Sequence, residues 1–315
     1  MNRCSLRASS VLVVLLAFLG PAQALADPVR VPGTNVSLQP PEGFARSESF
    51  PGFQSPEQQA SIMVTQMPAP VAEVMKGMNK ETLATRGMTL LSSSPETVGG
   101  REALLLQVGQ AAGGAEYLKW MLVAGDPQTT VLIVGTYPKN AGEQIGAAIR
   151  KSLLTASLAS ESPGDPHEGL LFRITPTQRL KIASRVGNML LLTESGSTAP
   201  LGPGEPIYIV GSSIGPGGSG DLKVFSEDRA RKTEQIQSLE NLSGREITIG
   251  GLTAWELLAD AKDKKSGTPV RLYQVIAPDG GGGYFIVQGL VGAGRADEMI
   301  LEFRRVTESF RKTDS

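Results

Sequence analysis

The sequence predicts an α+β protein built from two tandem α/β/α sandwich domains, each a mainly antiparallel sheet flanked by helices. The main observation is a repeated pattern, in which apolar runs within 117–134 flank a polar turn and the same arrangement recurs at 272–287. The two stretches align without a gap at an offset of 153 residues, with Asp126 and Asp279 at the same place in their turns. The second observation is a stretch containing Pro and Gly at 159–168, which has no apolar periodicity and reads as a linker between the copies.

Further blocks recur in the same order with slowly increasing offsets, as insertions in the loops of an internal repeat would produce. Each block is a short apolar or glycine signal that precedes or closes an expected strand or helix. The matching pairs are 38–40 with 174–176 at an offset of 136, 62–64 with 208–210 at 146, Gly99-Gly100 with Gly250-Gly251 at 151, and 149–153 with 306–310 at 157. We therefore expect a first domain at 30–158 and a second at 169–315.

The first domain should alternate strands with two helices. A helix preceded by Pro70 should run to about Gly87, and a closing helix should bury Ile149 and Leu153 on one face. Adjacent strands joined by short loops must pair antiparallel, so the helices should cover the sheet rather than link parallel strands. The expected strands are 36–38, 61–67, 89–98, 102–107, 117–124 and 130–136.

The second domain should repeat this plan with longer connections. Gly, Pro and Ser are concentrated at 196–206 and 211–220, between its early strands, where they replace the tighter connections of the first domain. Its closing helix should bury Met299, Phe303 and Val306, which are spaced by four and three residues.

The N-terminal residues 1–26 are typical of a signal peptide. Arg3 and Arg7 precede an apolar stretch at 11–19, and Ala24-Leu25-Ala26 supplies the small residues of a cleavage site. We expect cleavage before Asp27, a periplasmic or secreted protein, and no stable membrane insertion afterwards. The alternative is an uncleaved anchor, although the apolar stretch is shorter than the roughly 20 residues that a span requires.

Composition excludes several classes of function. The only cysteine is Cys4, inside the predicted signal peptide, so the mature chain would have no disulfide, thiolate nucleophile or cysteine metal site. The 30 basic and 31 acidic residues are nearly balanced, which argues against a general affinity for nucleic acid. Aromatic residues make up 5% of the chain and leave few platforms for stacking bases.

Residues with catalytic or metal-binding chemistry are scarce. His167, the only histidine, falls in the linker, and we expect it to be exposed because charged, Pro-containing linkers are usually solvated. Without a second histidine or a cysteine, zinc, copper and haem lose their usual ligands. A calcium or magnesium site made of carboxylates remains open, although no run of alternating Asp or Asn points to one. No catalytic, cofactor-binding or metal-binding residue is therefore named.

Two other features have a structural and a functional interpretation. Asp126 and Asp279 are expected to stabilise their turns through their own backbone. The glycine stretches at 215–220 and 289–294 lack the order of a nucleotide-binding motif, so flexible connection is the expectation. The amino end of the helix after Gly294 could still hold an anion.

Methionine gives the one candidate binding surface. Six of the nine methionines fall between Met63 and Met121. The residues expected to share one helix face, as an apolar groove for a partner peptide or a lipid, are Val71, Val74, Met75 and Met78. The alternative at this spacing is that the four side chains fill an irregular core.

The opening segment 36–44, the order of strands and helices, and the closing segment 149–153 resemble the PsbP-like α/β/α sandwich, including bacterial envelope proteins of the DcrB type. The counterparts of both segments in the second half carry the same likeness. The resemblance implies tandem PsbP-like domains, and members of the fold mostly bind or support other proteins.

The sequence thus favours an exported, non-catalytic protein whose two domains bind a protein partner in the cell envelope. One alternative is a carrier of an apolar small molecule or lipid, which needs an enclosed apolar pocket of about 300 Å³ or more. Another is a metal-independent enzyme that uses carboxylate, Ser and Lys groups, which needs titratable groups converging in a cleft. No cofactor and no nucleic acid is expected.

Overall fold

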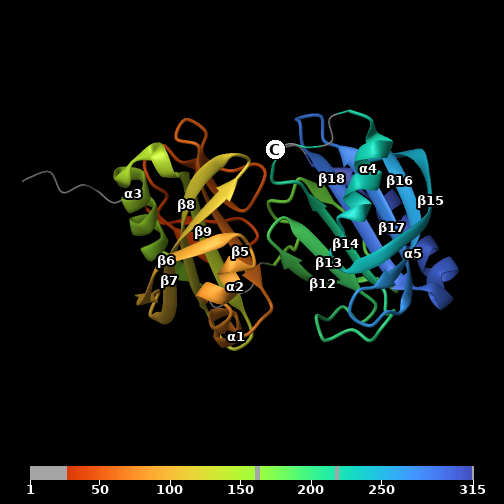
Figure 1. Ribbon diagram of the computed structural model, residues 1–315, viewed down its shortest axis with the longest axis horizontal. Helices are drawn as coiled ribbons and strands as arrows, with labels where there is room; N and C mark the ends of the chain where they lie inside the picture. The colour runs from red at the N-terminus through yellow and green to blue at the C-terminus, as the bar shows by residue number, and fades with distance from the viewer. Residues whose placement is uncertain (1–26, 160–163, 216, 218–219, 314–315) are drawn as a thin grey trace, which may run out of the picture.

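The computed structural model describes residues 27–159, 164–215, 217 and 220–313, so the predicted signal peptide lies outside the described residues. Two sheets lie side by side, one from each half of the chain (Figure 1). We call them, with the helices that cover them, the first unit and the second unit.

The sheet of the first unit has seven strands, and every neighbouring pair is antiparallel. The order across the sheet is β3-β4-β5-β9-β8-β7-β6, which puts the long hairpins at one side and two short strands at the other. The strands are β3 (Ala45–Arg46), β4 (Gly52–Ser55), β5 (Ala60–Met67), β6 (Met88–Val98), β7 (Arg101–Ala112), β8 (Ala115–Gly125) and β9 (Thr130–Pro138).

The sheet of the second unit has the same order, β12-β13-β14-β18-β17-β16-β15, again antiparallel throughout. The predicted α+β class with two mainly antiparallel sheets is confirmed. The strands are β12 (Lys181–Val186), β13 (Met189–Thr193), β14 (Ile207–Ser212), β15 (Ile236–Ile249), β16 (Leu252–Asp263), β17 (Pro269–Pro278) and β18 (Tyr284–Gly292).

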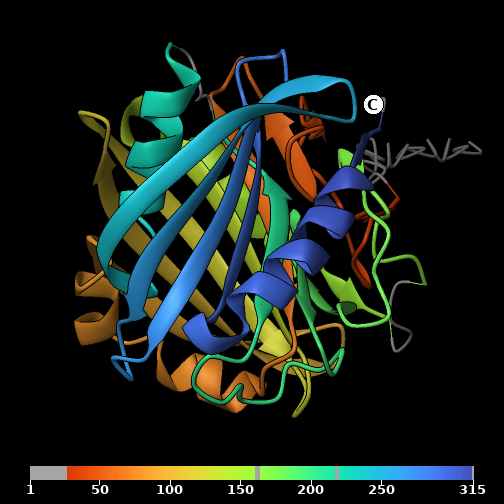
Figure 2. The same ribbon diagram turned by 90° about the vertical axis from the view of Figure 1, so that its right-hand side faces the viewer.

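Helices cover both faces of each sheet. Successive residues of a strand point to opposite faces, and in β8 Leu122 joins one apolar cluster with α3 while Met121 joins another that includes Leu83 of α2. The second unit does the same with α5 on one face and α4 on the other, and Figure 2 shows α5 lying diagonally across its sheet. The helices are α1 (Val71–Lys76), α2 (Lys80–Ala84), α3 (Glu143–Leu154), α4 (Leu222–Arg231) and α5 (Ala296–Glu308).

The closing helices end in the same way but not at the predicted offset. The Thr155 hydroxyl accepts the Gln39 N–H at 2.9 Å, and the Ser309 hydroxyl accepts the Thr175 N–H at 2.8 Å. The equivalent residues are therefore 154 apart, and the predicted offset of 157 was wrong. Short strands lie beside these contacts, namely β1 (Val29–Arg30), β2 (Val36–Leu38) and β10 (Ser157–Leu158) in the first unit, and β11 (Phe172–Arg173) and β19 (Arg311–Lys312) in the second.

The register of the central hairpins explains this offset. Gly125 pairs with Thr130 in the first unit, whereas Pro278 pairs with Tyr284 in the second, whose turn is one residue longer. The predicted gapless alignment is thus wrong beyond the turn. With the extra residue included, Gly135 of β9 and Gly289 of β18 become equivalent. A Cβ at either glycine would collide with the closing helix, at Ile149 and at Phe303 respectively, so glycine permits the close approach in both units.

The single helix predicted from Pro70 to about Gly87 is two short helices. α1 ends at Gly77, and α2 begins after Asn79, whose side chain accepts the Thr82 N–H at 2.9 Å. An asparagine in this position caps a new helix and competes with continuation of the preceding one, which the apolar spacing alone did not reveal. Among the described residues, no helix combines the length and the hydropathy that crossing a bilayer requires.

Candidate functional site

The predicted groove residues lie together, and their side chains face the sheet of the first unit. Val71, Val74, Met75 and Met78 are half-buried and pack against the cluster of Leu83, Leu106, Val108, Met121 and Val123. The α1 backbone is held at its start by the Val71 N–H, which donates to the Asp126 carbonyl at 3.1 Å. The four side chains thus contact the apolar cluster of the sheet, as the core alternative expects, and each remains partly exposed at the surface.

The prediction for the two aspartates is confirmed. The Oδ1 atom of Asp126 accepts the N–H groups of Gln128 and Thr129 at 2.9 and 2.7 Å. In the second unit, Asp279 Oδ1 accepts the N–H groups of Gly281 and Gly283 at 2.7 and 2.9 Å. The bond from the Gln128 N–H is the largest cause that lowers the pKa of the Asp126 carboxyl, and the bond from Thr129 adds to it. Asp126 and Asp279 each close their own hairpin.

The second glycine stretch is not the flexible connection that the sequence predicted. Gly289 and Gly292 lie within β18, where Gly292 donates its N–H to the Gly204 carbonyl at 2.8 Å. Gly294 falls in a short 3₁₀ turn, Ala293–Arg295, before α5. Glycine at position 292 permits close packing of the 201–206 loop on the strand, because a Cβ there would press against Gly204.

His167 is not exposed, and that prediction was wrong. Its side chain is only 10% exposed, with Nδ1 3.4 Å from Asp165 and Nε2 accepting the Ile174 N–H at 3.4 Å. Burial is the main cause that lowers the pKa of the imidazole. The end of the linker therefore folds onto the second unit. Within the described residues, no three His, Cys, Asp or Glu side chains gather as a metal site.

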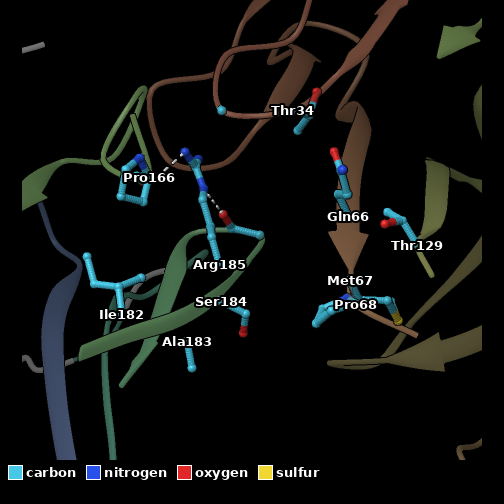
Figure 3. Close-up of a pocket in the computed structure, with 12 residues that line it drawn as sticks. Thr34, Gln66, Met67, Pro68, Thr129, Pro166, Ile182, Ala183, Ser184 and Arg185 are labelled. Carbon is cyan, nitrogen blue, oxygen red and sulfur yellow. Dashed lines mark hydrogen bonds between the residues drawn. The ribbon is translucent and has the colours of Figure 1, made fainter. Parts of the chain in front are cut away.

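A cavity of about 350 Å³ lies between the two units, and no sequence pattern indicated it. Residues of β5 and the segments around it form one wall, and consecutive residues of β12 form the other (Figure 3). Consecutive lining residues indicate that the edge of β12, rather than one of its faces, borders the cavity. The lining residues are Gly33, Thr34, Gln66, Met67, Pro68, Thr129, Pro166, Ile182, Ala183, Ser184, Arg185 and Gly187.

A network of polar contacts around the linker connects the two units beside this cavity. Glu168 forms an ion pair with Arg30 of β1 and accepts the Gly33 N–H at 3.2 Å. From the other side, Arg185 of β12 donates to the Pro166 carbonyl at 3.4 Å and to the carbonyl of Glu168. We call Arg30, Gly33, Glu168 and Arg185 the clasp, because together they join strands of both units to the linker.

Gly33 is required for the clasp. A Cβ at this position would collide with the guanidinium of Arg185, which rests directly on the glycine. Gly33 also has a φ of 71°, in the left-handed region that favours glycine. The sequence signals of this contact were a glycine in a turn before β2 and an arginine on an edge strand, neither of which identifies its partner.

Arg185 gives the cavity its electrostatic character. Of the described residues that line the cavity, Arg185 alone carries a charge. Burial lowers the pKa of its guanidinium to about 10, and its Nη2 has no hydrogen-bond acceptor among the described residues. The Glu168 carboxylate is shared with Arg30, so it only partly offsets the positive charge of Arg185.

The polar groups on the cavity wall are able to donate. Gln66 accepts the Asn35 N–H with its Oε1 at 3.1 Å. Its Nε2 donates to no other group in the described part of the chain. The hydroxyls of Ser184 and Thr129 likewise make no hydrogen bond to another described residue. Met67, Pro68 and Ile182 add apolar surface. The arrangement fits a ligand that presents acceptors and negative charge to a partly apolar cleft.

A second cavity, of about 620 Å³, lies in the second unit at the end of its sheet. It is lined mainly by apolar side chains beneath the 201–206 loop, with charged residues such as Lys264 and Lys265 among its lining. The apolar residues are Leu201, Ile207, Ile236, Val270, Leu290 and Val291.

Comparisons with known proteins give a limited likeness. No protein-family model and no curated protein matches the chain. The immunity protein TplEi of the type VI secretion system from Pseudomonas aeruginosa is 14% identical, with 85% of this chain and 96% of that chain aligned and a TM-score of 0.34. A chain of the Tle4–Tli4 complex is 12% identical, with 85% of this chain and 96% of that chain aligned and a TM-score of 0.36. LpqN of Mycobacterium tuberculosis, described as involved in cell envelope biogenesis, is 16% identical, with 45% of this chain and 83% of that chain aligned and a TM-score of 0.32.

Proposed function

We propose that the protein is an exported, non-catalytic binding protein of the cell envelope, and that a protein partner docks in the cleft between its two PsbP-like units. The observation that carries this proposal is the cavity of about 350 Å³, whose walls come from both units. The clasp beside it holds the linker between the units. A cleft built from two rigid sheets is preorganised, which lowers the entropy that binding must overcome. The signal segment and the order of strands and helices support export and the PsbP-like assignment.

The polar groups of the cleft suit binding rather than catalysis. Its titratable group is Arg185, an acid too weak to exchange protons near neutral pH even with its pKa lowered to about 10. The neighbouring hydroxyl of Ser184 has no histidine or carboxylate among the described lining residues to activate it.

Site-specific photo-crosslinking tests the proposed function. A benzophenone amino acid replaces Met67 on the cleft wall, or Lys151 on the exposed side of α3 as a matched control, in the full chain expressed in its own cells. The proposal predicts a discrete adduct with one polypeptide at position 67 and none at position 151. Equal labelling at both positions, or no adduct at 67, would contradict it.

A second candidate function is carriage of an apolar small molecule, and the cavity of about 620 Å³ favours it. The volume of this cavity exceeds the roughly 300 Å³ that a small ligand needs. The cavity lies in the second unit, however, and not under α1. An apolar fluorescent probe such as N-phenylnaphthylamine should bind the native chain and lose its signal in a Leu290→Glu variant. A signal that is unchanged in the variant would exclude this cavity as the site.

A further inference from the structure

We infer that the segment of the partner that enters the inter-unit cleft is an extended, acidic stretch of polypeptide. This inference rests on the proposed function and adds the chemistry of the partner. It depends on three features of the cleft, namely Arg185 as the one cation in its described lining, its unpartnered donors, and the outer edge of β12, which has no strand partner in the described structure.

The charge of the cleft selects an acidic ligand. Arg185 is half-buried, and no carboxylate is found among the described residues that line the cavity. The carboxylates whose charges act on it, Glu168 and Asp165, already form ion pairs with Arg30 and Arg173 respectively. A positive group in a partly desolvated cleft attracts a carboxylate more strongly than a surface arginine does, because solvent screens it less.

The hydrogen-bonding groups select the same chemistry. Gln66 Nε2, the Ser184 hydroxyl and the Thr129 hydroxyl are free to donate in the described structure, and they come from both walls of the cavity. Carboxylate and backbone carbonyl oxygens are the acceptors that a polypeptide offers, and bonds to a charged acceptor are the stronger ones. A basic segment would bring donors to donors and a cation to Arg185.

The shape of the site favours an extended segment. β12 is the edge strand of the second sheet, and Ile182, Ala183, Ser184 and Arg185 all border the cavity in sequence. An edge strand presents backbone N–H and C=O groups that an incoming strand can pair with. Figure 3 shows that Ser184 lies across the open space from Met67 and Pro68, which would contact the alternate side chains of such a strand.

Charge substitutions at Ser184 test the inference without removing the clasp. Ser184→Glu places a carboxylate beside Arg185 and should repel an acidic segment, whereas Ser184→Lys should attract it. Ser92→Glu is the matched control, because Ser92 is exposed on β6, the edge strand of the first sheet opposite the cleft. Thermal melts of each purified variant establish that it remains folded.

The probe is a phage-displayed library of random 12-residue peptides, selected on the full native chain. Enriched peptides should carry Asp or Glu between alternating apolar residues. Their affinity should fall on the order of 30-fold for Ser184→Glu, rise for Ser184→Lys, and stay unchanged for Ser92→Glu.

The outcomes separate this inference from the proposed function. Enriched peptides without acidic residues, or peptides indifferent to the charge at position 184, would overturn the acidic segment. Failure to enrich any peptide while the Met67 adduct still forms would overturn an extended segment as the occupant and leave partner binding in place. Loss of both the peptides and the adduct would remove the proposed function itself.

Discussion

In the first unit the layer opposite α3 consists of α1 and α2, which bury Leu83 alone and otherwise contact the sheet through half-buried Val and Met side chains. In the second unit the equivalent layer is α4, which is fixed by polar contacts. Gln274 of β17 donates to the carbonyl and hydroxyl of Ser226 at 2.8 and 2.9 Å, and Gln288 donates to Gln274 at 2.9 Å. Two sheets of one strand order thus hold their second layers differently, since α4 adds this buried amide network to its apolar contact through Ala230.

This difference indicates where each unit can adapt. Flexible thioethers tolerate repacking, because Met side chains fill irregular spaces without a directional requirement. A buried amide network tolerates only the geometry that satisfies every donor and acceptor. We expect the α1 surface to change shape more easily than the α4 surface, and the inter-unit cleft lies beside the first of these at Met67 and Pro68.

The largest expected effect concerns the layer that both units share, the closing helix. Phe303 is fully buried against Tyr208 and Tyr273, and Phe303→Ala should cost about 3–5 kcal/mol of the unfolding free energy of the second unit. Ile149→Ala should cost about 2–5 kcal/mol in the first unit. Calorimetry measures both variants. If each substitution lowers both transitions equally, the two cores do not unfold separately.

The polar layer of the second unit should be the more sensitive of the two. Gln274→Leu leaves the partners Ser226 and Gln288 without their bonds in a buried site, and should cost about 1–3 kcal/mol. Met78→Leu in the first unit keeps the apolar volume and should cost less than about 1.5 kcal/mol. Urea titrations of the two variants compare them directly. A more damaging Met78→Leu would reverse the proposed difference.

The clasp should make the contact between the units depend on pH. The hydrogen bond from Arg30 is the largest cause that lowers the pKa of the Glu168 carboxyl below its usual 4.5. A depressed pKa in the folded state gives stability that is present above pH 4.5 and lost as the pH falls through the folded value. The native chain should therefore melt at a higher temperature than Glu168→Gln at pH 7, and the gap should close as the pH falls below 4.5 and through the folded value. A gap that does not vary with pH would contradict the role given to the ionised carboxylate.

The smallest expected effect distinguishes the two hairpin turns. Asp126→Ala and Asp279→Ala each remove two bonds to backbone N–H groups and should cost about 1 kcal/mol. Asp126 also lies 3.4 Å from Arg101, so its replacement should cost slightly more. Chemical denaturation of both variants provides the measurement, and a cost below about 0.3 kcal/mol for both would mean that the turns form without the carboxylates.

Periodicity and turn chemistry predicted much of the fold. The strands at 61–67, 89–98 and 130–136 lie within β5, β6 and β9, because alternating apolar residues and bounding Pro or Gly are local signals. The extra residue in the second hairpin was not visible, since a five-residue loop with four glycines after Asp279 aligns as easily with a gap as without one. The cap at Asn79 was overlooked because Met78 and Thr82, on either side of it, keep the helical spacing.

The site between the units depends on contacts that no local pattern encodes. Gly33 and Arg185 are 152 positions apart, and each has an ordinary structural reading in its own segment. His167 was expected in solvent because the linker composition is polar, yet it is buried where the chain folds back beside Asp165 and Ile174. Composition indicates how a segment behaves alone, whereas burial is decided by what folds against it.

If the two units present one shared cleft, their relative position must be fixed, and this is the quantity to measure. In the full chain with Cys4→Ser, spin labels at Leu91→Cys and Leu301→Cys place one probe on an exposed site of each unit. Pulsed electron resonance should give a single narrow distance distribution that broadens when Glu168→Gln is added, because the clasp then loses its ion pair. A broad distribution in the chain with an intact clasp would show two units moving independently on their linker and would contradict the shared cleft.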